Sequence, residues 1–171
     1  MTNNANTLEA TTEVVISPEA LLRHWQAHRG LTRRTIEAFP EDKLFNFSIG
    51  GMRPFAELVM EMTGLAGEGM EGMVTGNWIS LQELQGLRAN MPKTKAGLLE
   101  LWDSVTAKID ELWPQLPVSR FGETVLSFGQ WESPIRHMIL YWIDNEIHHR
   151  AQGYVYLRAL GIEPPPFWDR F

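Results

Sequence analysis

The chain has 171 residues, of which 44% are hydrophobic and 11% aromatic, so it can bury the core of one domain of ordinary size. Its formal net charge is −6, which argues against binding to nucleic acid or to an anionic membrane surface. It contains no cysteine, which excludes disulfides, thiolate metal ligands and a cysteine nucleophile.

Residues 1–16 are polar, rich in Asn and Thr, and lack the charged-then-apolar pattern of a signal peptide. We expect a flexible tail there and a single domain over residues 17–171. The longest apolar run, residues 138–143, is far too short to cross a bilayer. These features favour a soluble cytoplasmic protein without a nucleic-acid or membrane partner.

Four segments with apolar residues at helical spacing predict four long helices. The first is expected over residues 18–39. Ser17 is a preferred N-cap residue type, Pro18 suits the first helical position, and Pro40 ends the helix.

The second predicted helix covers residues 53–74. Its second half enters a cluster of glycines between Gly64 and Gly76, and each interior glycine costs a helix about 1 kcal/mol relative to alanine. Such a cluster either frays the helix or permits a close approach of its backbone to a neighbour. A connector over residues 76–92 follows, with a short helical turn expected at residues 80–87.

The third helix is capped by Thr94, and its apolar seam ends at Leu116. A long crossover follows over residues 117–132, in which residues 124–128 could be briefly extended. No convincing run of strands is present.

The fourth helix is expected to begin at Ser133-Pro134, which repeats the cap-then-proline start, and to end before Gly161 and a run of three prolines. Four amphipathic helices with long connections predict an all-α fold, a four-helix bundle with long crossover connections.

The fourth helix has a seam that is apolar at both ends and polar in the middle. Its positions, at alternating steps of three and four, are Ile135, Met138, Trp142, Asn145, His149, Gln152, Tyr156 and Ala159. Asn145 and His149 lie one above the other on the same face, and Glu146 is a further inward candidate. Glu61 is the only ionisable residue on the second helix with apolar neighbours on both sides, so we expect it to face Asn145 and His149.

A carboxylate and an imidazole that face each other inside a bundle can hold zinc, iron, nickel or manganese. The alternative is a buried salt bridge between Glu61 and His149, with Asn145 hydrogen-bonded beside it. The residues themselves leave both interpretations open, but a polar patch in a core must be paired, metal-bound or functional.

His24 and His28 form another pair four residues apart. Only His28 lies on the apolar stripe of its helix, where it could line the same cavity as Glu61. More often such a residue is a core histidine with one hydrogen bond. We interpret Arg150 as solvated or paired to an acidic neighbour.

Asp144 and His148 lie about 100° around the fourth helix from the polar seam, on a face that we interpret as an edge or subunit contact. The seven tryptophans exceed what a bundle seam needs. We therefore predict a homodimer whose shared surface includes Tyr141, Val155, Trp168 and Phe171.

The stretch Glu-Ile-His-His-Arg-Ala-Gln-Gly-Tyr-Val-Tyr-Leu-Arg-Ala-Leu-Gly-Ile-Glu-Pro-Pro, residues 146–165, resembles the last helix of the DinB-like family. Residues 53–62 resemble its second helix. The family comprises small bacterial four-helix bundles, often dimeric, many of them described as metalloenzymes. Its three metal-binding histidines correspond here to Glu61, Asn145 and His149, of which only His149 matches in type.

The resemblance implies a divalent metal (Zn, Ni, Fe or Mn) held by these three residues. Some relatives are metal-dependent transferases or isomerases with a small thiol as cosubstrate. In such an enzyme Glu61 would be a ligand or general base, and His28 or Gln152 would contact the substrate. The alternative is a non-catalytic, small-molecule-binding or stress-associated bundle with a degenerate metal site, in which the same residues form a polar core network.

Overall fold

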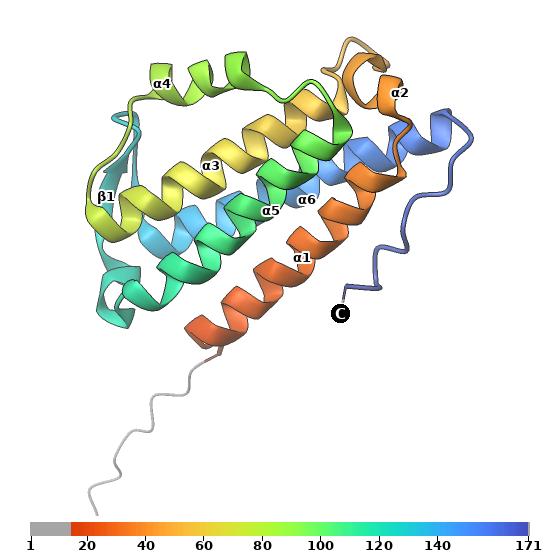
Figure 1. Cartoon of the computed structure of the whole chain (residues 1–171). Coiled ribbons are helices and arrows are strands. Elements are labelled where there is room, and N and C mark those ends of the chain that lie inside the picture. The colour runs from red at the N-terminus through yellow and green to blue at the C-terminus, as the bar shows by residue number, and fades with distance from the viewer. Residues whose placement is uncertain (1–14, 171) are drawn as a thin grey trace, which may run out of the picture.

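Four long helices form the body of the computed structural model, which describes residues 15–170 (Figure 1). They are α1 (Pro18–Ala38), α3 (Phe55–Thr75), α5 (Lys95–Leu112) and α6 (Ile135–Ala159). Both α1 and α3 pack on α5 and on α6, so α1 and α3 occupy opposite corners. The predicted all-α four-helix bundle is confirmed. Most of the predicted tail, and Phe171, lie outside the described residues.

Short helices lie in the connections. They are α2 (Glu41–Asn46), α4 (Leu81–Gly86), η1 (Leu87–Asn90), η2 (Trp113–Gln115) and η3 (Val118–Gly122). The helical turn expected after α3 is confirmed as α4, where Ser80 and Glu83 form a capping box. In contrast, α2 was not predicted, because only Leu44 of its six residues is buried and no apolar period marks it.

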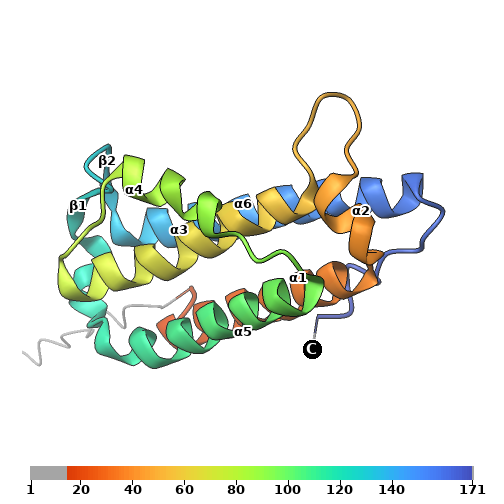
Figure 2. The ribbon, with the colours of Figure 1, turned by 45° about the horizontal axis from the view of Figure 1, so that its top comes forward.

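Two short strands, β1 (Thr124–Ser127) and β2 (Trp131–Pro134), form an antiparallel hairpin at one end of the bundle (Figure 2). The predicted extended stretch is confirmed, but the prediction that Ser133 caps the fourth helix was wrong. Ser133 pairs with Val125 in the hairpin, and Pro134 occupies the N-cap position without a side-chain hydrogen bond. Few β-branched residues mark β2, so its sequence did not indicate a strand.

The glycine cluster does not fray α3, which continues to Thr75 and ends at Gly76 in the left-handed conformation. Instead it admits two indole rings. A Cβ atom on Gly69 would lie 2.2 Å from the Trp142 ring, and one on Gly72 would lie 2.4 Å from the Trp78 ring. The apolar area that these rings bury offsets the low helix propensity of glycine.

The core consists of two apolar clusters separated along the bundle axis. One includes Trp25, Trp113 and Trp142 near the hairpin, and the other includes Phe55 and Tyr156 near α2. Between them the helices bury polar side chains, namely His28, Arg29, Thr32, Thr35, Thr63, Glu146, His149 and Arg150. We call this region the polar layer.

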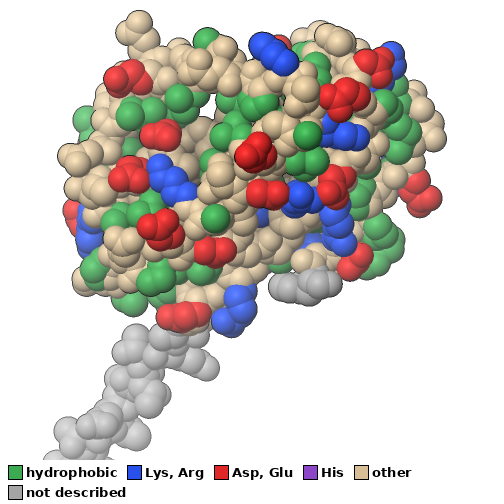
Figure 3. Space-filling view, in the orientation of Figure 1, with side chains coloured by type: hydrophobic (Ala, Val, Ile, Leu, Met, Phe, Trp, Pro, Cys, Tyr) green, Lys and Arg blue, Asp and Glu red, His purple; other side chains and the backbone are tan. Residues whose placement is uncertain are grey.

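The outer surface is charged and mixed in sign. Ion pairs such as Arg33–Asp103 and Lys108–Glu71 join neighbouring helices. Acidic and basic side chains are interspersed among the described residues of the face drawn in Figure 3, where no extended basic area is visible. Within residues 15–170, none of the helices combines the length and the apolar character needed to cross a membrane.

Candidate functional site

The three residues that the family resemblance assigns to metal lie together. Of these, His149 belongs to the buried polar layer, whereas Glu61 and Asn145 are half-buried beside it. In α3, Glu61 places Oε1 3.0 Å from Nε2 of His149 and 3.3 Å from Nδ2 of Asn145, both in α6. Because a carboxylate only accepts hydrogen bonds, both α6 side chains donate to it. This is the arrangement of the salt-bridge alternative.

Two arginines complete the group. The Oε2 atom of Glu61 lies 2.7 Å from Nη2 of Arg53, just before α3, and 3.0 Å from Nη2 of Arg88, in η1. Neither arginine was predicted to take part. We call Arg53, Glu61, Arg88, Asn145 and His149 the Glu61 cluster.

The Glu61 cluster stabilises an ionised carboxylate. The hydrogen bond from His149, followed by that from Arg53, holds the pKa of Glu61 well below its ordinary value, although partial burial acts in the opposite direction. The side chain is still 23% exposed. Glu61 is therefore a charged acceptor that solvent can reach.

The donors around Glu61 fit a divalent cation poorly. Both carboxylate oxygens already accept hydrogen bonds, and a guanidinium stays protonated, so Arg53 and Arg88 would repel a cation bound to Glu61. Asn145 offers only a neutral ligand. Across residues 15–170, no group of three or more His, Cys, Asp or Glu side chains is placed to hold a metal ion. The unused Nδ1 of His149, buried and without a partner among the described residues, does not alter this balance.

A pocket of about 600 Å³ lies beside Glu61, between α3, α4 with η1, the hairpin and the first half of α6. Its wall is mostly apolar and includes four aromatic side chains, those of Phe128, Trp131, Tyr141 and Trp142. Glu61 and Arg88 are among its polar lining residues. Pockets for organic ligands typically have volumes of about 300–1,000 Å³ and this mainly apolar lining.

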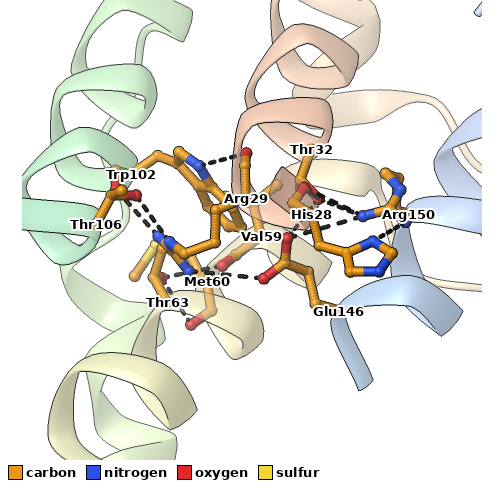
Figure 4. Close-up of polar contacts among 10 residues, drawn as sticks. All are labelled: His28, Arg29, Thr32, Val59, Met60, Thr63, Trp102, Thr106, Glu146 and Arg150. Carbon is orange, nitrogen blue, oxygen red and sulfur yellow. Dashed lines mark hydrogen bonds and ion pairs between the residues drawn. The ribbon is translucent and has the colours of Figure 1, made fainter. Parts of the chain in front are cut away.

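A second charged group lies on the other side of α6, inside the bundle (Figure 4). Glu146 accepts a hydrogen bond of 2.7 Å from Oγ1 of Thr32. Its oxygens lie 3.7 Å from Nη1 of Arg29 and 3.8 Å from Nη1 of Arg150. We call these four residues, with His28, the Glu146 cluster.

Arg29 is fully buried, yet most of its guanidinium is engaged (Figure 4). It lies 3.9 Å over the ring of Trp102 and donates from Nε to Thr106 at 2.7 Å. Its Nη2 atom donates to the carbonyl of Trp102 at 3.1 Å. Burial lowers the pKa of Arg29 to about 10, so the side chain remains charged at neutral pH. Charge, stacking and hydrogen bonds together tie α1 to α5.

His28 belongs to this second cluster. Its Nδ1 lies 2.9 Å from Nη2 of Arg150, and its Nε2 lies 3.0 Å from Nη1 of Arg170. Burial, followed by the charge of Arg150, lowers the pKa of His28 to about 3. The ring is therefore neutral at pH 7 and can accept a hydrogen bond at one nitrogen only.

The structure does not bring the other candidate residues to Glu61. His28 lies among the arginines of the second cluster and does not line the pocket. Gln152 instead contacts His148, with 2.8 Å between Nε2 atoms on the exposed side of α6. Arg150 is buried rather than solvated, and its acidic neighbour is Glu146.

A family model described as the DinB family matches residues 1–170. The fold resembles the crystal structures of two DinB-like proteins. One, from Bacillus cereus ATCC 10987, has a TM-score of 0.69 at 13% identity, covering 86% of this chain and 95% of that one. The other, from Bacillus subtilis, has a TM-score of 0.68 at 21% identity, covering 88% and 97%. A search of curated proteins found no sequence match.

Proposed function

This chain belongs to the DinB family, and we propose that it is a binding protein that takes a small organic molecule into the pocket beside Glu61. The observation that supports this proposal most is the pocket itself, about 600 Å³ in volume and bordered by a charged cluster at Glu61 and Arg88. A mainly apolar wall with a few polar groups is the usual design of such sites.

The aromatic wall indicates where the body of the ligand binds. Trp131 and Tyr141 are 47% and 60% exposed, whereas Trp142 and Phe128 are buried behind them. A flat apolar molecule that covers the two exposed rings would remove apolar surface from water. The pocket therefore suits a molecule with an aromatic or cyclic body.

The proposal is tested with N-phenylnaphthylamine, a neutral probe whose fluorescence rises in an apolar site. We expect saturable binding of one probe per chain. Replacing Trp131 by alanine should lower the affinity about three- to tenfold, because an aromatic contact contributes about 0.5–1.5 kcal/mol. The control is Leu126→Ala, which removes an exposed apolar side chain of β1 that does not line the pocket. Unsaturable binding, or equal effects of the two variants, would contradict the proposal.

A second candidate is a divalent metal held by Glu61, Asn145 and His149, in a transferase that uses a small thiol. One observation favours it: these residues meet within 3.0 and 3.3 Å at the positions that the family resemblance assigns to metal. Metal content after soaking and dialysis tests it. If the second candidate is right, the protein should hold about one equivalent of metal per chain, the His149→Ala variant should lose it, and the His24→Ala variant should keep it. Our proposal predicts far less than one equivalent of bound metal.

We also propose a homodimer through the exposed face of α6 and the C-terminal segment, where Val155 and Trp168 are exposed. Tyr141, which the sequence analysis placed on the same surface, lines the pocket. Light scattering at micromolar concentration should give twice the mass of one chain. Val155→Asp should reduce it to one, and Val118→Asp, a control at another exposed valine, in η3, should not. A monomeric mass for the unmodified protein would remove this proposal.

A further inference from the structure

The Glu61 cluster holds more positive than negative charge. One carboxylate, Glu61, faces two guanidiniums, those of Arg53 and Arg88. Among the described residues, each guanidinium makes a single hydrogen bond, to Oε2 of Glu61. Because an arginine has five N–H donors, most of this donor capacity is unused.

Solvent can reach both guanidiniums. The side chain of Arg53 is 34% exposed and that of Arg88 is 41% exposed. Arg88 also lines the pocket, and it is the only Arg or Lys side chain among the lining residues that the structure describes. A ligand in the pocket can therefore contact Arg88 without any change in the fold.

The position of Arg88 sets the orientation of such a ligand. Arg88 follows α4 in η1, and Gln85, one turn earlier, lines the same side of the pocket and offers an amide donor. The aromatic side chains come from the hairpin and α6. The pocket thus has donors from α4 and η1, and aromatic rings from the hairpin and α6.

We propose that the ligand is an amphipathic monoanion, such as an aromatic carboxylate or sulfonate, whose anionic group binds Arg88 in exchange for Glu61. This inference rests on the proposed function and names the class of its ligand. The guanidiniums supply the positive charge, and the planar fork of Arg88 matches two oxygens of one anionic group. Glu132, a second carboxylate at the pocket wall, disfavours ligands with more negative charge.

Arg88 can exchange Glu61 for the ligand because Glu61 keeps other hydrogen-bond donors. When Arg88 turns to the ligand, Glu61 still accepts hydrogen bonds from Arg53, His149 and Asn145. The carboxylate is therefore not left unpaired, and the desolvation penalty for an isolated charge does not arise. A cationic ligand gains nothing comparable, since two guanidiniums already neutralise Glu61.

The test compares two probes with nearly the same ring system. Anilinonaphthalene sulfonate carries one negative charge, and N-phenylnaphthylamine carries none. We expect Arg88→Ala to lower the affinity for the sulfonate at least about tenfold, as the loss of a charge-assisted hydrogen bond does, and to leave the neutral probe unchanged. Arg88→Lys, which keeps the charge but loses the fork, should give an intermediate affinity. Arg23→Ala, at an exposed position on α1, is the control for non-specific charge effects.

Replacing Glu61 by glutamine provides a test of opposite sign. The variant removes the competing carboxylate charge and frees both guanidiniums, so the affinity for the sulfonate should rise several-fold. A metal ligand or a general base at this position would give no such gain. A fall in sulfonate affinity would overturn the proposal.

The outcomes separate this inference from the proposed function. If Arg88→Ala weakens the binding of both probes equally, or leaves the affinity for the sulfonate unchanged, the proposed contact between the anionic group and Arg88 is overturned. Saturable binding of the neutral probe would in that case still support the pocket as a binding site. If neither probe binds the unmodified protein, both proposals fail.

Discussion

Two carboxylates, one inside the polar layer and one beside it, have similar partners and different surroundings. Glu61 and Glu146 each face two guanidiniums, and a histidine lies in each cluster. The side chain of Glu61 is 23% exposed and that of Glu146 only 3%. The arginine contacts of Glu61 are hydrogen bonds of 2.7 and 3.0 Å, whereas those of Glu146 are ion pairs of 3.7 and 3.8 Å.

The pKa shifts of the two groups have opposite directions. Hydrogen bonds from His149 and Arg53 lower the pKa of Glu61, while burial raises the pKa of Glu146 against the attraction of its arginines. The same residue types thus form an accessible site in one place and a fixed part of the core in the other. Access to solvent, more than composition, decides which cluster can exchange a partner for a ligand.

The largest expected effect is on stability. Glu146→Ala leaves two buried guanidiniums without their counter-charge, so the free energy of unfolding should fall by about 3–5 kcal/mol. Glu61→Ala, whose two arginine partners can turn to water, should lower it by only about 1 kcal/mol. Urea denaturation of both variants measures the difference. Equal decreases in the free energy of unfolding for the two variants would contradict the contrast between the buried Glu146 cluster and the solvent-accessible Glu61 cluster.

The histidine of the buried cluster should make stability depend on pH. The pKa of His28 is about 3 in the folded chain and about 6.5 in an unfolded one. Between these values the unfolded state binds a proton that the folded state does not, so stability is complete above pH 6.5 and falls as pH decreases.

This pH dependence can be assigned to His28 with a matched pair of variants. The free energy of unfolding is measured by urea denaturation at pH 7 and at pH 5. In His28→Gln the difference between the two values should be much smaller than in the unmodified protein. His148→Gln, at an exposed histidine of α6 outside the Glu146 cluster, should keep the full difference. If His28→Gln keeps the full difference in the free energy of unfolding, His28 is not its cause.

A smaller effect is expected for Glu61. Because its folded pKa lies below the ordinary value of 4.5, its contribution to stability is present above about pH 4.5 and is lost as pH falls through the folded pKa. Glu61→Gln should therefore lower the melting temperature by a few degrees at pH 7 and by less at pH 3. An equal decrease at both pH values would show that the carboxylate charge plays no part.

The sequence predicted one inward side of α6 correctly and the other only in part. A single apolar seam identifies Asn145 and His149, which face Glu61 on α3. However, α6 also packs on α1, where Glu146 lies buried as expected and Arg150 is buried as well, which the sequence did not predict. A helix buried against two neighbours presents two inward faces. When only one seam is traced, charged residues of the other inward face are indistinguishable from surface residues.

Arg53 and Arg88 could not be predicted for a different reason. Arg88 lies 27 positions after Glu61, in a connector whose path depends on packing against α3. Helical periodicity predicts contacts between long helices but not the position of a connector. The hairpin was missed because β2, Trp-Glu-Ser-Pro, has no β-branched residue that would indicate a strand, although the stretch containing β1 was expected to be extended.

The central claim is that Arg88, at an accessible pocket, exchanges Glu61 for the anionic group of a ligand. A crystal structure with anilinonaphthalene sulfonate tests this claim most directly. We expect the rings of the probe to pack against Trp131 and its sulfonate to lie within about 3 Å of the Arg88 guanidinium. Glu61 should still accept its hydrogen bond from His149. A probe bound outside the pocket, or a metal ion on Glu61 with Arg88 turned away, would contradict the account.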